Sequence, residues 1–592
     1  MNPQLRSCMP TRQPRQLRLW MLVGGAVGVL LVWSPEALSA QPAAVIAEQD
    51  VFQNDGQNVP GRPNQNSTPP GGQTPLGGPG PVGAQPAFAT TEWKASGLPR
   101  LNLKRRPNIL FVLADDLGYA ELGCYGQQKI KTPHLDRLAS QGMRFTQHYA
   151  GSPVCAPSRC VLMTGKHTGH AAIRDNREMK QLPEQIAKQY GIEPEFSGQQ
   201  PLPDEEITLA ELLKKAGYVT ACIGKWGLGQ FGTSGDPNRQ GFDLFYGYNC
   251  QRHAHSYYPA YLWENGRKVP LANDPPVPGH AKLPPGADPN DPASYRPFQG
   301  KDYAPDRMLR RAEQFIRDNK DRPFFLFYTT PLVHLALHIP EEDLKAYLGL
   351  WPETPFTGNG YTPHPTPRAA YAAMVSRLDR DVGRLLALLE ELDLEKDTIV
   401  FFSSDNGTTH LPKEVDAAFF QSVGPLRGLK GSLYEGGIRV PLIVRWPGQI
   451  PPGTISEHIS AFWDILPTVA ELLGLDPPAG IDGISFAPTL LGRPEEQKKH
   501  EYLYWEIESY GGQLALRMGC WKGVMQGLHS KGGGLGAAGF GSRLELYNLE
   551  NDIGEKQDVS AQHPDLVRKM RELIHQAHTP NPLFRMIPLD PE

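Results

Sequence analysis

The segment at residues 155–165, CAPSRCVLMTG, combines a thiol with a helix start and a fixed positive charge. A lone cysteine is ordinarily a buried structural residue, but Pro157 is typical of the first turn of a helix. We therefore expect a helix N-terminus close to Cys155, where amide donors and the helix dipole favour an anion. Arg159, one turn further on, adds a planar fork suited to a tetrahedral oxyanion. The spacing predicts a thiol beside an anion-binding site.

Polar side chains follow four short apolar runs that are typical of buried parallel strands. The runs lie at residues 108–114, 219–223, 323–328 and 398–403. The residues that follow them are Asp115 and Asp116, Lys225, His334, and Asp405 with Asn406. Because ligands of open α/β sheets bind at the carboxyl ends of the strands, we expect these side chains to converge on one site.

Four of these residues predict a metal site. Asp115, Asp116, Asp405 and Asn406 offer only oxygen atoms, which suit Ca²⁺ or Mg²⁺ and argue against zinc or copper. Two adjacent carboxylates repel each other unless a cation lies between them. We therefore expect a bound divalent cation, either Ca²⁺ or Mg²⁺.

Elements that could position these residues are visible along residues 107–496. Strand-like runs alternate with amphipathic helices, one of which starts with a capping box of Thr208 and Glu211. A long helix carries apolar residues at helical spacing: Met374, Leu378, Val382, Leu386 and Leu389. This alternation predicts a doubly wound α/β catalytic domain.

The pattern changes from residue 497 onward. Residues 500–507, 514–518 and 544–547 are typical of short antiparallel strands, and residues 564–577 of a helix. We expect a small C-terminal subdomain over residues 497–592. Glycine-rich residues 532–541 predict a flexible loop within it.

The N-terminal segment predicts export. Residues 1–40 contain four arginines, an apolar stretch at 19–33 and the ending Ala-Leu-Ser-Ala, the pattern of a signal peptide. We expect a periplasmic or secreted protein with no stable membrane insertion after signal removal. The Pro- and Gly-rich residues 41–106 predict a disordered linker. A formal net charge of −4 over 592 residues gives no case for a nucleic-acid partner.

The motif C-x-P-S-R followed by T-G resembles the signature of the type I sulfatases, in the alkaline phosphatase superfamily. Further blocks resemble sulfatase blocks: PNILFVLADD at 107–116, GKW at 224–226, TIVFFSSDNG at 398–407, LRGLKGSLYEGGIRVP at 426–441 and DILPTVAELLG at 464–474. The resemblance implies a large mixed, mostly parallel sheet flanked by helices, with a small C-terminal antiparallel sheet plus helix. It also implies that a formylglycine-generating or anaerobic maturation enzyme converts Cys155 to Cα-formylglycine, whose hydrated aldehyde is the nucleophile.

The resemblance also assigns roles to individual residues. It implies that Asp115, Asp116, Asp405 and Asn406 bind calcium together with the side chain at position 155. Arg159, Lys225 and Lys430 would bind the sulfate oxygens, and His334, with Lys430, would protonate the leaving alcohol. The implied reaction is hydrolysis of a sulfuric ester, with a sulfated carbohydrate or an aryl sulfate as substrate.

One position departs from the family pattern. The common block GKWHLG reads GKWGLG here, so that Gly227 stands where the family has a histidine that acts on the aldehyde hydrate. His255 is our candidate for a substitute, with His253, His167 and His170 as alternatives.

Two other functions remain open at this point. A phosphonate or phosphodiester hydrolase of the same superfamily would share the fold and the aspartates, although Cys155 with Arg159 favours a sulfatase. A non-catalytic protein that binds sulfated glycans would explain Gly227, although the retained Cys155, Lys225 and metal residues oppose it.

Overall fold

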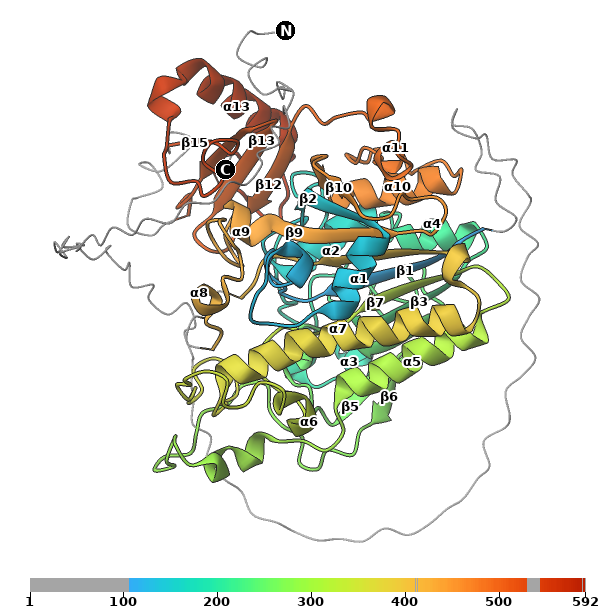
Figure 1. Ribbon diagram of the computed structural model, residues 1–592, viewed down its shortest axis with the longest axis vertical. Helices are drawn as coiled ribbons and strands as arrows, with labels where there is room; N and C mark the ends of the chain where they lie inside the picture. The colour runs from blue at the N-terminus through green and yellow to red at the C-terminus, as the bar shows by residue number, and fades with distance from the viewer. Residues whose placement is uncertain (1–105, 410, 412–413, 530–542, 588, 591–592) are drawn as a thin grey trace, which may run out of the picture. The chain divides into compact units, whose positions relative to one another are not determined.

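The computed structural model describes residues 106–592 except 410, 412–413, 530–542, 588 and 591–592 (Figure 1). The predicted signal peptide, linker residues 41–105 and the glycine-rich loop at 532–541 lie outside the described residues. The described chain contains two β-sheets. Among the described residues, no helix combines the length and the apolar character that a membrane span requires.

The larger sheet has eleven strands. In spatial order they are β10 (Thr454–Ser456), β2 (Met143–Tyr149), β9 (Arg439–Arg445), β8 (Thr398–Ser404), β1 (Asn108–Ala114), β7 (Phe324–Thr329), β3 (Val219–Lys225), β4 (Leu244–Tyr248), β5 (Tyr261–Glu264) and β6 (Arg267–Pro270), with β11 (Ser460–Ala461) pairing with β2.

The central strands β8, β1, β7, β3 and β4 pair in parallel, whereas β9, β5 and β6 pair antiparallel with their neighbours. The prediction of a large, mixed, mostly parallel sheet is therefore confirmed. Strand β1 has the predicted bounds, and β3 extends two residues beyond its predicted end, so that Lys225 is its last residue.

Apolar side chains on the two faces of this sheet form two separate cores, because successive strand residues point to opposite faces. In β1, Ile109 and Phe111 belong to one core and Leu110 and Val112 to the other. The first core includes side chains of α2 (Cys155–Thr164), α4 (Leu209–Lys215), α10 (Ile465–Leu472) and α11 (Ala487–Leu490). The second includes side chains of α1 (Pro133–Gln141), α5 (Ala304–Asp318) and α7 (Pro367–Glu391).

The long helix α7 deviates from the predicted spacing near its end. Leu385 is fully buried, whereas Leu386 is only partly buried, because the inward face of a helix drifts relative to a strict four-residue step. The capping box of Thr208 and Glu211 forms as predicted at the start of α4. The shorter α-helices are α3 (Glu184–Tyr190), α6 (Glu341–Leu344), α8 (Ala417–Phe420) and α9 (Glu435–Ile438).

The smaller sheet lies in the C-terminal part of the chain (Figure 1). Its antiparallel strands are β12 (Leu503–Ile507), β13 (Gln513–Met518), β14 (Trp521–Met525) and β15 (Glu545–Asn548). Helix α13 (Pro564–Ala577) has the predicted bounds and packs its apolar side chains against this sheet. Strand β14 was not predicted, because Lys522 and Gly523 interrupt its apolar pattern, yet Lys522 is fully buried.

Candidate active site

The predicted site residues meet where the central strands of the larger sheet end. Asp115 and Asp116 follow β1, Asp405 and Asn406 follow β8, and Lys225 ends β3. All five are buried, as are Cys155, Arg159, His334 and Lys430. Residues up to 315 positions apart in the chain therefore form one cluster, as the strand-end argument predicts.

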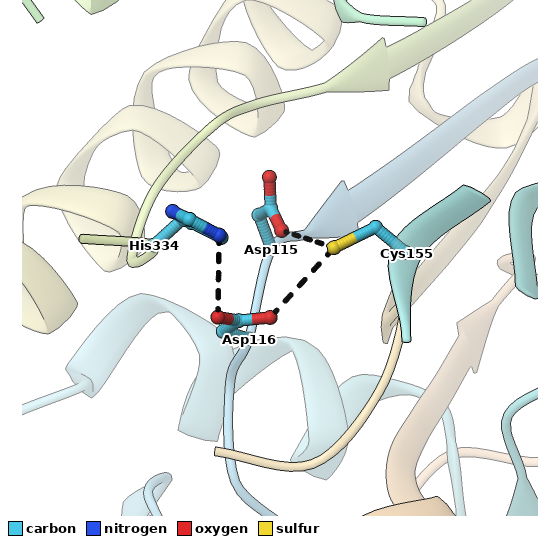
Figure 2. A group of neighbouring side chains, drawn as sticks. All are labelled: Asp115, Asp116, Cys155 and His334. Carbon is cyan, nitrogen blue, oxygen red and sulfur yellow. Dashed lines mark hydrogen bonds and ion pairs between the residues drawn. The ribbon is translucent and has the colours of Figure 1, made fainter. Parts of the chain in front are cut away.

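Cys155 begins helix α2 and faces the paired aspartates (Figure 2). Its Sγ lies 3.6 Å from Oδ1 of Asp115 and 4.0 Å from Oδ1 of Asp116. Helix α2 receives no capping hydrogen bond from the side chain of Val154. Instead, Asn176 Oδ1 accepts a hydrogen bond of 2.8 Å from the backbone N–H of Ala156. The thiol therefore stands at a helix N-terminus, as predicted.

Three cations surround the three carboxylates. Arg159 donates to Asp405 Oδ2 through Nε at 3.1 Å and Nη2 at 2.8 Å. Lys225 Nζ lies 2.7 Å from Asp115 Oδ2, and Lys430 Nζ lies 2.8 Å from Asp116 Oδ2. A buried charge is stable only when it is paired, so that these ion pairs allow the carboxylates to remain ionised out of contact with water.

The ionisation of each group follows from burial and its neighbours. Burial acts to raise the pKa of Asp115, but Lys225 and other basic neighbours outweigh it, and the pKa is lowered. Burial and the other two aspartates raise the pKa of Asp405 to about 6. Burial raises the pKa of the Cys155 thiol to about 12, so the unmodified thiol is a poor nucleophile at neutral pH.

The oxygen atoms in this cluster fit a divalent cation. Asn406 Oδ1 is buried and has no hydrogen-bond partner among the described residues, although Asn406 Nδ2 donates to Asp116 Oδ1 at 2.7 Å. An unpartnered buried acceptor beside three carboxylates is the environment that Ca²⁺ or Mg²⁺ satisfies. Ligand-capable atoms of Asp115, Asp116, Cys155 and His334 also lie within 4.8 Å of one another (Figure 2).

The histidines divide between this site and other parts of the fold. His334 Nε2 lies 3.6 Å from Asp116 Oδ2 (Figure 2). The Nδ1 atom of His334 bonds to Leu335 O at 2.6 Å. The ring of His255 stacks on that of His334 with centroids 5.0 Å apart, and its Nδ1 lies 2.7 Å from His280 Nε2. His255 therefore joins the site through His334. Its predicted role in place of the family histidine stays a prediction.

The alternative candidates lie in other surroundings. His253 packs among Phe196, Tyr248 and Tyr261. His167 and His170 stack on each other beside Asp482, which bonds to His170 Nδ1 at 2.8 Å. Gly169 N–H donates to His167 Nδ1, so that a neutral His167 carries its proton on Nε2. We interpret this trio as a structural hydrogen-bond cluster.

The space beside Gly227 is occupied by a residue that the sequence analysis missed. A Cβ at Gly227, whose φ is +78°, would lie 3.2 Å from Cγ and Nε2 of Gln251. Gln251 Nε2 lies 3.2 Å from Asn176 Oδ1, the acceptor of the Ala156 N–H. Gln251 and Asn176 gave no local signal in the sequence, because their importance comes from contacts between distant segments.

Comparisons with known proteins agree with this geometry. The family model described as Sulfatase matches residues 107–475, more than half of the chain. The chain belongs to the sulfatase family. It is an enzyme that hydrolyses sulfate esters, and the predictions of family and reaction are confirmed.

Several sulfatases are similar in sequence to most of this chain. Arylsulfatase A of Homo sapiens is 33% identical, covering 80% of this chain and 88% of its own length. N-acetylgalactosamine-6-O-sulfatase of Bacteroides thetaiotaomicron is 30% identical, covering 80% and 94%. The solved structure of Ps i-CgsB in complex with k-i-k-neocarrahexaose has a TM-score of 0.60 at 27% identity, covering 79% of this chain and 93% of that one.

Proposed function

We propose that this sulfatase removes sulfate from a sulfated carbohydrate through a Cα-formylglycine at position 155 and a bound Ca²⁺. The observation that carries the proposal is the position of Cys155 Sγ, at the start of α2 and within 4.0 Å of Oδ1 of both paired aspartates. A thiol with a pKa of about 12 has no evident use there unless it is chemically converted.

The names of two relatives support a carbohydrate substrate. One acts on N-acetylgalactosamine 6-sulfate and the other was solved with a neocarrahexaose. Arylsulfatase A, which is similarly close, is named for aryl sulfates. A sugar sulfate is therefore our first candidate, and a small aryl sulfate serves as the reference substrate.

The charges of the site favour an anionic ester. A Cα-formylglycine supplies an aldehyde whose hydrate carries two geminal hydroxyls, and a bound divalent cation supplies positive charge for the sulfate oxygens. Arg159, Lys225 and Lys430 already balance the charges of Asp115, Asp116 and Asp405. A divalent cation held by Asp115, Asp116, Asp405 and Asn406 would therefore give the site net positive charge, which would attract the sulfate group and stabilise its transition state.

The departing alcohol requires a proton. His334 carries a proton on Nδ1 when that atom donates to Leu335 O, and protonation of Nε2 gives an imidazolium that can transfer a proton to the ester oxygen. Burial lowers the pKa of His334 to about 4, so that its imidazolium is scarce at neutral pH. Lys430, whose pKa is raised well above its usual value by Asp116 despite burial, stabilises negative charge on the same oxygen. In the net reaction the S–O bond to the alcohol oxygen breaks, the oxygen of one water molecule completes inorganic sulfate, and one proton of that water goes to the alcohol.

Mass spectrometry of the peptide that contains Cys155 tests the modification. We expect an aldehyde in protein co-produced with a maturation enzyme, and an unmodified thiol without one. Only the modified protein should release inorganic sulfate from N-acetylgalactosamine 6-sulfate, a carrageenan oligosaccharide or 4-nitrophenyl sulfate. The variant Cys155→Ala is the control. Faster hydrolysis of the matched phosphate ester than of 4-nitrophenyl sulfate would contradict the proposal.

Chelation tests the cation. Removal of Ca²⁺ by EGTA should abolish sulfate release and lower the melting temperature, because three buried carboxylates lose a charge partner. Ca²⁺ should restore both properties at a lower concentration than Mg²⁺. Equal values of both properties before and after chelation would exclude a bound cation as a cofactor.

We also propose export to the periplasm or the medium, on the basis of residues 1–40. N-terminal sequencing of the exported protein should give a chain that starts at Gln41. A chain that keeps residues 19–33 and stays in the membrane fraction would contradict signal removal.

A further inference from the structure

Tyr510 occupies the turn between β12 and β13 in an unusual conformation. Its φ is +55°, a left-handed value that residues other than glycine rarely adopt. The residue is 47% exposed, and it is the one aromatic among the large hydrophobic residues that are exposed in the described part of the chain. Strained residues cluster at functional sites, and an outlier of this kind calls for a functional explanation.

Side-chain hydrogen bonds fix this turn on both sides. Ser509 donates to Asp175 through its backbone N–H at 2.6 Å and through Oγ at 2.8 Å. Asp175 directly precedes Asn176, which binds the N–H of Ala156. Arg177 Nη2 lies 2.7 Å from Glu508 Oε2. The turn is therefore attached to the segment that supports the start of α2.

The loop that carries Lys430 forms the second attachment. Gln513 Nε2 donates to Gly431 O at 2.7 Å, and Gln513 Oε1 accepts from Leu433 N at 3.0 Å. The ring of Tyr510 packs on Gly431, where a Cβ would lie 2.6 Å from Cε1 of the ring. Gly431 has a φ of +83° as well, so that both the backbone and the ring require glycine.

The surroundings of the phenol agree with a position beside the reacting atoms. Although 47% of the residue is exposed, partial burial of the phenol raises the pKa of Tyr510 to about 12; Lys430 opposes this, and Cys155, Asp175 and Asp116 add to it. The phenol therefore lies within electrostatic range of the proposed sulfate-binding lysine and of position 155, and its ring packs on Gly431, the residue that follows Lys430.

We infer that Tyr510 is a substrate-binding residue whose ring packs against the face of a pyranose ring next to the sulfated carbon. The inference rests on the proposed function and adds a specificity determinant from the C-terminal sheet. An aromatic ring held in place by its backbone offers a flat apolar surface with little loss of side-chain entropy, and sugar C–H groups pack well on such a surface.

The variant Tyr510→Asn tests the inference, because Asn tolerates left-handed backbone but has no ring. We expect the ratio of kcat/KM for a saccharide to kcat/KM for 4-nitrophenyl sulfate to fall about tenfold, mainly through KM. The saccharides are N-acetylgalactosamine 6-sulfate and a carrageenan oligosaccharide. Tyr510→Phe should keep the wild-type ratio. Leu350→Asn, which changes an exposed apolar residue elsewhere, is the matched control.

Binding without turnover gives a second measurement. In the Cys155→Ala background, Tyr510→Asn should raise the Kd of the same saccharides about tenfold by calorimetry. Wild-type ratios and Kd values in Tyr510→Asn would overturn the inference and leave the proposed function intact. Failure of the modified wild-type protein to bind or hydrolyse either saccharide would overturn both.

Discussion

Each of the paired aspartates divides its two carboxylate oxygens between different partners. Oδ2 of Asp115 pairs with Lys225 and Oδ2 of Asp116 with Lys430, while both Oδ1 atoms face Cys155. The lysines therefore orient the carboxylates as well as supplying charge. Removal of one lysine should disturb both functions.

We expect Lys225→Met to lower kcat/KM for 4-nitrophenyl sulfate by about 10²–10³, the cost of losing one fixed positive group at a transition state. The variant also leaves Asp115 without its 2.7 Å partner. Steady-state kinetics on fully modified protein measures the effect. Lys166→Met, which breaks a partly exposed pair with Glu206, should keep wild-type kinetics. A loss of less than threefold in Lys225→Met would refute the assigned role.

Hydrogen bonds between different elements also fix the geometry of the site. Helix α2 begins at Cys155, and its first turn depends on Asn176, twenty residues after Ala156, for an acceptor of the Ala156 N–H. Caps of this kind contribute about 1 kcal/mol to stability. Here the same bond also fixes the backbone next to the proposed nucleophile.

Asn176→Ala should lower the free energy of unfolding by about 1 kcal/mol and reduce kcat more than it changes KM. Asn176→Asp keeps an oxygen acceptor for Ala156 N–H and should recover most of the stability. Asn290→Ala, in an exposed loop, is the control. Chemical denaturation together with kinetics separates the two effects, and an unaltered kcat in Asn176→Ala would remove the positioning role.

The contact between β2 and β11 predicts a pH dependence. His148 in β2 is buried and its Nδ1 lies 2.8 Å from Ser460 Oγ, and burial lowers its pKa from 6.5 to about 3. The unfolded state therefore binds a proton that the folded state rejects between these pH values, so that stability falls as the pH falls. The expected slope is up to about 1.4 kcal/mol per pH unit.

His148→Gln keeps a hydrogen-bonding side chain but has no titrating group. The difference in unfolding free energy between His148→Gln and wild type should therefore shift in favour of the variant as the pH falls from 6.5. Denaturant unfolding at several pH values measures it. A difference that is constant with pH would show that His148 does not titrate with a lowered pKa.

Sequence and structure agree where local chemistry determines the element. Strand β1 and helix α13 have the predicted bounds, since apolar runs and helix signals are written in consecutive residues. Asn176, Gln251 and Gln513 could not be predicted, because each acts through a hydrogen bond to a distant segment. His255 was associated with the site by its residue type, and its stacking on His334 required the fold.

At the scale of the whole molecule, a buried ion cluster connects the smaller sheet to α9, the helix that directly precedes β9 of the larger sheet. Lys522 of β14 is fully buried, 2.9 Å from Glu435 Oε1 and 3.1 Å from Glu555 Oε1. Glu435 starts α9, which follows the loop that carries Lys430. The smaller sheet is thus bonded to the segment that supplies one of the site lysines.

Lys522→Met should destabilise the protein by about 3–5 kcal/mol, because two buried carboxylates lose their shared cation. Thermal and denaturant unfolding measure this change. Lys569→Met, in α13, breaks an exposed contact with Glu501 and should alter stability by less than about 1 kcal/mol. Equal stability of the two variants would mean that the ion pairs of Lys522 contribute nothing to the free energy of unfolding.

The two hydrogen bonds between Gln513 and the loop that carries Lys430 have a consequence for biosynthesis. The ribosome synthesises all strands of the larger sheet before it reaches Gln513. A nascent chain can therefore form most of that sheet while the loop that carries Lys430 still lacks its hydrogen bonds to Gln513. The ability to hydrolyse sulfate esters should then arise late, only after strands β12 to β15 have folded. A chain that ends at residue 500 should therefore be compact but should not hydrolyse sulfate esters.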